Sequence, residues 1–187
     1  VENPDTYPVS PKQHTFEYLR EVAHLPHDAE DAAEFAPWWT AQGNGQWIAL
    51  RRRFLTLLDE QAQLERMARI IGKDALPARQ RLTLLCAELV NEAFLRQSAF
   101  SEIDRVCSPE RQAAMMRVLG RFIDLAETAL GAGIEPDRIG SLACVRALQR
   151  MGEEVADHEL ARLDELEARI EREFAQLAPS REPSDAA

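Results

Sequence analysis

Between residues 38 and 178 the chain carries only three of its ten prolines, namely Pro77, Pro109 and Pro136. Each follows a polar or turn-forming stretch, and proline is tolerated at the first position of a helix but disrupts its interior. Ser108 stands immediately before Pro109 and supplies a hydroxyl suited to a helix N-cap. The three prolines therefore predict three helix starts, with long helices between them.

Apolar residues between these marks recur every three or four positions, which is the spacing of one helical face. We predict helices over residues 46–72, 77–95, 109–130, 136–150 and 157–177. Strict alternation of apolar and polar residues is missing, so no sheet is predicted. The expected apolar stripe of the first helix comprises Ile48, Leu55, Leu58, Leu64, Met67 and Ile71, and the expected core includes Leu82, Leu85, Leu89, Met115, Val118 and Phe122.

The fold class that follows is all-α, a helical bundle of about five or six helices with short connections. Residues 35–178 form the bundle in this prediction. Residues 1–34 are expected to be an extended or weakly helical segment, because residues 1–15 hold three prolines and few apolar residues. Residues 179–187 are polar and are expected to be a disordered tail.

The charge balance argues against two classes of partner. Of the 187 residues, 32 are acidic and 22 are basic, so the formal net charge is -10. Nucleic acid and anionic membranes need a cationic face and are not expected as partners. No apolar run approaches the ~18 residues of a membrane span, so direct membrane insertion is not expected. Cys86, Cys107 and Cys144 are too widely spaced for a metal pair or a disulfide framework, which favours buried, reduced thiols in a cytoplasmic protein.

The motifs that suggest chemistry are incomplete. Glu21 and His24 have the spacing of di-iron bundle ligands, but a second such pair is missing, so no metal site is predicted. Gly72-Lys73 is followed by Asp74 and lacks the other features of a phosphate loop. The three arginines of residues 51–53 point in different directions on a helix, which favours a solvated collar over a docking patch. The apolar stripe of residues 160–177 fits either packing within the domain or a coiled-coil seam.

The stretch from Ile70 to Gln112, "IIGKDALPARQRLTLLCAELVNEAFLRQSAFSEIDRVCSPERQ", resembles the C-terminal helical domain of the catalytic A subunit of V-type and archaeal-type rotary ATPases. A weaker resemblance extends back to Trp38-Trp39 and forward to Leu177. The matching residues, in order, are Gly72, Asp74, Ala75, Leu76, Pro77, Arg81, Leu82, Thr83, Leu84, Ala87, Phe94, Leu95, Gln97, Ala99, Phe100, Asp104, Cys107, Pro109, Glu110 and Gln112.

The resemblance implies a role for each end of the hairpin formed by residues 46–95. The turn between its helices is the counterpart of an acidic loop that faces the central rotor shaft, a role that would fall on Asp74, Ala75, Leu76 and Pro77. The other end corresponds to the segment whose aromatic ring lies against the adenine of a bound nucleotide. That role would fall on Phe100, with Gln97 and Ala99 beside it.

Two readings of Phe100 remain open at this point. Its ring is either a core residue that closes the hairpin or a partly exposed surface for adenine, and the matched "QxAF", formed by Gln97, Ala99 and Phe100, favours the second. The sequence departs from the family pattern nearby, because Arg96 and Ser98 replace polar residues usual there and Arg79 stands where an acid is usual.

The resemblance also implies partners and cofactors. The whole catalytic chain would hydrolyse or make ATP together with B subunits and a rotor shaft, coupled to proton or sodium transport. ATP or ADP with Mg would bind in the full complex, on the cytoplasmic, membrane-peripheral head. This chain, a fragment by this interpretation, holds no catalytic residue, and alone it is expected to be inactive and to hold no cofactor. The alternative is a stand-alone helical interaction or assembly module without catalysis, which the lack of an upstream Walker motif in the same reading frame would favour.

Overall fold

The computed structural model describes residues 36–177, except 42–43, 97–100, 102 and 105–106. The described residues contain helices and no strand, which confirms the all-α prediction. Residues 36–41 are helical. The further elements are α3 (Trp47–Ile71), η2 (Lys73–Ala75), α4 (Ala78–Val90), η3 (Asn91–Leu95), α5 (Pro109–Gly131), α6 (Pro136–Gly140), α7 (Ala143–Glu154), η4 (Asp157–Glu159) and α8 (Ala161–Ala175).

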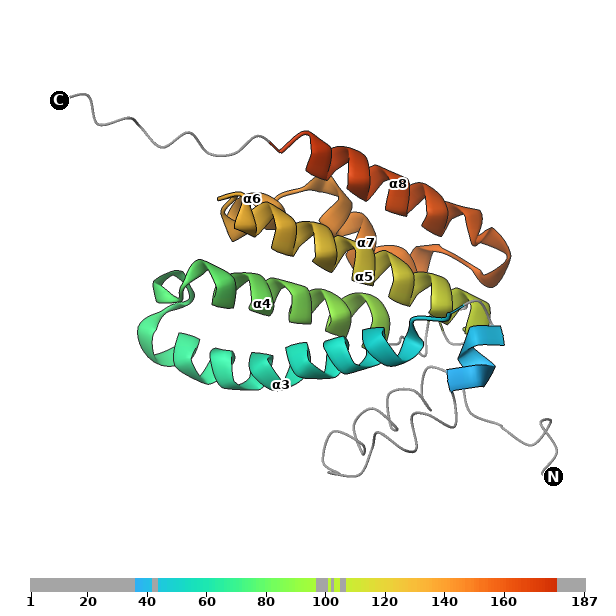
Figure 1. Ribbon diagram of the computed structural model, residues 1–187, viewed down its shortest axis with the longest axis horizontal. Coiled ribbons are helices and arrows are strands. Elements are labelled where there is room, and N and C mark those ends of the chain that lie inside the picture. Colours follow the sequence, from blue (N-terminus) through green and yellow to red (C-terminus); the bar gives the residue numbers. More distant parts are fainter. Residues whose placement is uncertain (1–35, 42–43, 97–100, 102, 105–106, 178–187) are drawn as a thin grey trace.

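Helices α3 and α4 form a long antiparallel hairpin closed by the short η2 turn (Figure 1). Helix α5 packs on this hairpin from one side and carries α8 along its other side, while α7 contacts both α8 and η3 (Figure 1). The prolines act as predicted, because Pro109 and Pro136 occupy the first turns of α5 and α6. The Ser108 hydroxyl accepts a hydrogen bond from the Arg111 N–H at 3.2 Å and so caps α5.

One continuous apolar core joins these helices. Two edge-to-face aromatic pairs tie it together, Phe54 with Phe94 at 6.1 Å and Phe122 with Phe174 at 5.4 Å between ring centroids. Of the six residues predicted for the core, Leu85 is half-buried against it. The other five are buried, and they are Leu82, Leu89, Met115, Val118 and Phe122.

The predicted stripe of α3 is confirmed only in part, because Ile48 and Leu58 pack against the core but the last turns of the helix do not. Leu64 is buried, but Ile48, Leu55 and Leu58 are only half-buried, and Met67 and Ile71 are exposed. The reason is that α3 packs against α4 and α5 together, and this contact selects a neighbouring face of the helix. The buried residues of α3 are Trp47, Leu50, Arg51, Phe54, Leu57 and Leu64.

The helix predicted over residues 136–150 is also corrected. Helix α6 ends at Gly140, and Leu142 adopts an extended conformation (φ -59°, ψ 141°) before α7 begins. The break lets Ile139 on one side and Cys144 on the other both enter the core, which a single straight helix would not do. The stripe of residues 160–177 packs within the domain, because α8 lies against α5 and α7.

The arginines of residues 51–53 do not form a solvated collar. Arg51 is buried, and its guanidinium lies 5.9 Å from the ring centroid of Trp47, a cation–π contact. Arg53 is half-buried and pairs with Glu127 at 2.8 Å, so only Arg52 of the three is exposed. The sequence pattern missed this because it cannot show which face of α3 meets α5.

Candidate functional site

The turn of the hairpin is built by a glycine and a single turn of 3₁₀-helix. Gly72 ends α3 with φ 89°, a conformation that residues with a side chain rarely adopt, and its N–H donates to the Ala68 carbonyl at 2.9 Å. Lys73 opens η2 and pairs with Glu88 of α4 at 2.7 Å. These contacts join both helices next to the turn.

The four residues proposed for a rotor contact do not all face outward. Asp74, Ala75 and Pro77 are exposed, whereas Leu76 is buried. Leu76 packs with Leu64 of α3 and Leu84 of α4 in a small apolar cluster separate from the main core. The turn is therefore anchored to the hairpin by its own core.

The middle of the hairpin is held by polar and aromatic contacts. The Asn91 side-chain amide donates to Gln61 Oε1 at 2.7 Å, and the Gln61 amide in turn donates to Glu65 at 2.9 Å. Phe54 and Phe94 add their aromatic contact nearer the other end. Helix α4 and η3 together hold about 18 residues, roughly 27 Å of helix at 1.5 Å per residue. Contacts spread over this length make the hairpin a rigid unit.

At the end opposite the turn, α4 widens into the π-helical η3, and the N–H of the following residue, Arg96, donates to the Asn91 carbonyl at 2.7 Å. The residues proposed for adenine contact, Gln97, Ala99 and Phe100, lie outside the described residues. π-Helical turns are rare and are frequent at functional sites. The adenine contact of these three residues stays a prediction.

A buried arginine joins the chain after this segment to the bundle. Arg111 is fully buried and donates through Nη1 to the Ile103 carbonyl at 2.9 Å and through Nη2 to the Gly152 carbonyl. Its Nη1 also lies 3.8 Å from Asp157. One side chain thus connects the start of α5, the loop at Ile103 and the end of α7. In the sequence, Arg111 is only a charged residue in the first turn of a predicted helix, and nothing in the pattern indicates that it is buried.

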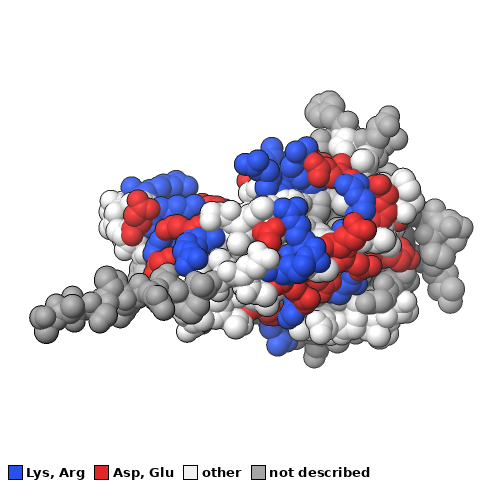
Figure 2. All heavy atoms as spheres, turned by 90° about the horizontal axis from the view of Figure 1, so that it is seen from above, with Lys and Arg blue, Asp and Glu red and all other residues white. Residues whose placement is uncertain are grey.

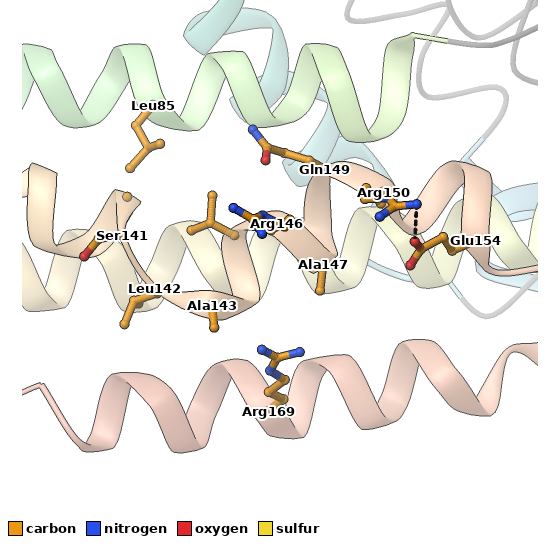
Figure 3. A pocket seen from close by; sticks show the side chains of 12 residues that line it. Leu85, Ser141, Leu142, Ala143, Arg146, Ala147, Gln149, Arg150, Glu154 and Arg169 are labelled. Atoms are coloured by element: carbon orange, nitrogen blue, oxygen red, sulfur yellow. Dashed lines mark ion pairs between the residues drawn. The ribbon is translucent and has the colours of Figure 1, made fainter.

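A groove of about 730 Å³ lies along α7, between α4 and α8 (Figure 3). Arg146, Arg150 and Arg169 line it together with the apolar residues Leu85 and Val145. Figure 3 shows the Arg150 side chain directed to Glu154, and the two groups form an ion pair at 2.8 Å. The groove is therefore mixed in character, with cations that are partly neutralised by neighbouring acids.

Glu173 of α8 accepts hydrogen bonds from two donors beside this groove. It accepts the Cys144 backbone N–H at 2.9 Å and the Arg169 side chain at 2.7 Å. Burial raises the pKa of the Glu173 carboxyl, but these hydrogen bonds outweigh burial and leave its pKa lowered. Glu173 thereby covers the beginning of α7, where Leu142 provides no side-chain cap.

The three cysteines are buried thiols outside any disulfide, as predicted. Burial raises the pKa of Cys86 to about 12. Burial, and then the charge of Glu173, raise the pKa of Cys144 to about 12. Because the thiolate is the reactive form, these groups are structural rather than nucleophilic. Within the described ranges, histidine, cysteine and carboxylate side chains form no cluster of three or more suited to a metal ion.

Positive and negative side chains alternate on the face that carries α8 (Figure 2). Arg117 of α5 pairs there with Asp164 and Glu167 of α8, and Arg121 pairs with Glu171 at 2.6 Å. Exposed pairs of this kind contribute little stability each, ~0–1 kcal/mol. In the part of the chain that the structure describes, no helix is long and apolar enough to cross a membrane.

The geometry defines an all-α domain organised around a rigid helical hairpin. Residues 36–138 match the family model of the C-terminal domain of V and A type ATP synthase. Because this match covers more than half of the chain, the chain belongs to that family, as the resemblance implied.

Individual relatives agree with this assignment. The chain is 36% identical over 138 residues to the A subunit of the A-type ATP synthase of Thermococcus onnurineus, a match that covers 73% of this chain and 24% of the relative. It is 34% identical over 140 residues to the V-type ATP synthase alpha chain of Clostridium novyi, covering 75% of this chain and 24% of the relative. With the corresponding A-type protein of Pyrococcus horikoshii the identity is 39% over 114 residues, 61% of this chain and 12% of the relative. The chain thus spans a quarter or less of the length of these relatives.

Proposed function

We propose that this chain acts as the C-terminal helical domain of the catalytic subunit of a V/A-type rotary ATPase. The observation that carries the proposal is the family match over residues 36–138, which includes the whole hairpin. In the complex, copies of the catalytic chain alternate with B subunits around a central shaft, in the membrane-peripheral head on the cytoplasmic side. ATP hydrolysis or synthesis is coupled there to proton or sodium transport.

In this proposal the hairpin connects the nucleotide to the shaft. Phe100, with Gln97 and Ala99, forms the adenine side of the nucleotide site, and the turn at Asp74, Ala75, Leu76 and Pro77 meets the shaft. The rigid body between them supports this role, because a packed helix pair transmits a domain movement without bending. Stacking of an aromatic ring on adenine contributes binding without specific base contacts.

Phosphate and magnesium binding are assigned to another part of the catalytic chain. The sequence contains no phosphate-loop motif, and phosphoryl transfer depends on such a loop and on carboxylates that hold the metal. The residues of this chain would position the adenine and transmit movement, whereas the nucleophilic water and the γ-phosphate would be held elsewhere.

A chimera tests the proposal. Residues 36–177 replace the matching region of the Thermococcus onnurineus relative, and the product is combined with the B and shaft subunits of the same organism. We expect assembly and ATP hydrolysis coupled to shaft rotation. A chimera that folds but neither assembles with B subunits nor supports turnover would instead favour an interaction module without a catalytic role.

Phe100→Ala in the active chimera tests the adenine contact. We expect nucleotide binding to weaken by ~1–3 kcal/mol, the usual contribution of one base–aromatic stack. Thermal melting of the isolated chain should hardly change. Unchanged nucleotide affinity together with loss of folding would identify Phe100 as a core residue instead.

A further inference from the structure

Helix α7 has one buried face and one exposed face. The buried face points into the core and comprises Cys144, Val145, Leu148 and Met151. Ala143, Arg146 and Arg150 are exposed, and their spacing of three and four residues places them together on the opposite side of the helix. This exposed face forms much of the floor of the groove between α4 and α8 (Figure 3).

Three arginines line the groove, and one of them has no acidic partner. Arg150 pairs with Glu154 at 2.8 Å, and Arg169 of α8 pairs with Glu173 at 2.7 Å. Arg146 forms no ion pair with any described residue, and Figure 3 shows it in the middle of the groove, between the α4 side and the α8 side. The groove therefore keeps an excess of positive charge, although the chain as a whole has a net charge of -10.

Apolar and small side chains lie on both sides of this cation. Leu85 lines the groove from α4, and Leu142 lines it at the beginning of α7, and both are half-buried. Ala143 and Ala147 stand one helical turn apart and add only a methyl group each, so the floor of the groove stays low beside Arg146. A second helix can therefore approach α7 closely along this face.

Hydrogen bonds at two places hold the walls of the groove in position. The Gln149 side-chain amide donates to Glu92 at 2.9 Å and joins α7 to η3. The Cys144 N–H donates to Glu173 at 2.9 Å and joins the beginning of α7 to α8. The groove is thus formed before any partner binds, which lowers the cost of ordering on association.

We propose that this groove is the docking site for an α-helix of another protein, one that presents two carboxylates a helical turn apart beside small or apolar residues. Arg146 and Arg150 are themselves one turn apart, so they match such a pair of carboxylates. The small or apolar residues of the partner helix would lie on Ala143, Ala147 and Leu85. This docking goes beyond the proposed function and does not depend on it.

The extent of the groove sets the strength of the complex. Helix α7 has 12 residues, so it is about 18 Å long and contacts about three turns of a partner helix. A stable complex buries about 800 Å² on each partner, which is more than three turns of one helix provide. We therefore expect weak, reversible binding that depends on salt. The acidic character of the rest of the chain disfavours nucleic acid as the occupant.

The test uses the whole chain and fluorescent, alanine-rich peptides of about 18 residues, a length that allows a helix in water. One peptide carries two glutamates a helical turn apart with leucines beside them, and the second carries glutamine at both glutamate positions. Fluorescence anisotropy at about 0.05 M salt should show the glutamate peptide bound about tenfold more tightly. Amide NMR signals should shift on α7 and around Arg169 and stay unchanged on α3.

Reversal of one charge identifies the cation. Arg146→Glu should weaken binding of the glutamate peptide about tenfold and leave the glutamine peptide unaffected. A peptide with lysine at both glutamate positions should bind Arg146→Glu more tightly than the wild type. Arg52→Glu is the matched control, because Arg52 is an exposed arginine of α3 outside the groove. This control should bind the glutamate peptide as the wild type does.

Equal affinities for the glutamate and glutamine peptides, or equal weakening by Arg146→Glu and Arg52→Glu, would overturn the inference. Tighter binding of inorganic pyrophosphate than of the glutamate peptide would also overturn it and define a site for small anions. A dimer of the wild-type chain that Arg146→Glu dissociates would identify the occupant as a second copy. Binding to the isolated chain that is lost in the assembled chimera would make the groove a contact between subunits of the ring. Either of these last two results would overturn the assignment to a separate partner.

Discussion

Arg111 shows how one side chain can organise a junction. Guanidinium groups are rarely buried, because desolvation is costly unless the donors find acceptors. Arg111 is fully buried and satisfies carbonyls of Ile103 and Gly152, which belong to segments far apart along the chain. It thereby fixes the chain that follows the proposed adenine-contact residues.

Arg111→Met should lower the free energy of unfolding by about 2–4 kcal/mol, since the carbonyls of the buried Gly152 and the half-buried Ile103 lose their donor. Arg117→Met is the matched control, because Arg117 lies further along α5 but is about half-exposed in its ion pairs. That control should cost less than about 1 kcal/mol. Urea unfolding followed by circular dichroism measures both, and equal effects would contradict the role given to Arg111.

The raised pKa values of the buried thiols predict that the free energy of unfolding decreases at alkaline pH. Both Cys86 and Cys144 have their pKa raised from 9.0 to about 12 in the folded protein. The unfolded chain therefore releases these protons first, so the stability contribution is complete below pH 9 and declines as the pH rises from 9 toward 12. We expect the Cys86→Ala/Cys144→Ala variant to lose less stability than the wild type between about pH 8.5 and 10.5. Denaturant titrations at each pH measure this, and equal losses of stability in the wild type and the variant would contradict the prediction.

At the scale of the elements, close approach of α3 and α5 sets the position of the hairpin on the bundle. Gly120 lies in the middle of α5, where glycine normally destabilises a helix by about 1 kcal/mol. A Cβ atom built there would lie 2.5 Å from Leu50 Cδ2 of α3. Glycine at this position therefore leaves room for the Leu50 side chain between the two helices.

Gly120→Val should destabilise the protein by about 1–3 kcal/mol, because the added side chain would overfill the α3–α5 contact. Gly131→Val, at the end of the same helix with nothing within 4 Å of its Cβ position, should change stability by less than about 0.5 kcal/mol. Thermal melts of the two variants make the comparison. Similar melting temperatures for both would show that α3 and α5 can separate at little cost.

At the scale of the whole molecule, the proposed function makes the bundle a lever and assigns the phosphate chemistry to another part of the catalytic chain. We predict that the isolated chain neither hydrolyses ATP nor binds it with micromolar affinity. Triphosphate affinity comes mainly from phosphate contacts and magnesium, which the motifs of this chain do not supply. Isothermal calorimetry with Mg-ATP measures the affinity, and micromolar binding would contradict the assigned division of roles.

The sequence by itself determined the fold class, the hairpin and the family. Proline at helix starts, Ser108 as a cap and the three- to four-residue apolar spacing are local properties, and local backbone preferences decide where helices begin and end. The run around the turn was specific enough to identify the family that the comparison over residues 36–138 confirmed. The roles of Phe100, Gln97 and Ala99 remain predictions from that run.

Only the tertiary structure decided which faces of those helices are inside. Met67 and Ile71 fit the apolar period of α3 as well as Leu64 does, yet they are exposed and Leu64 is buried. Arg111 is buried where carbonyls and an acid from other segments meet it. Arg51 is buried on α3, where its guanidinium lies over the Trp47 ring of the same helix. Periodicity records where along a helix the apolar groups stand, but burial depends on which neighbours pack there. Those neighbours include residues far away in the chain, as α5 does for α3 and α8 does for α5.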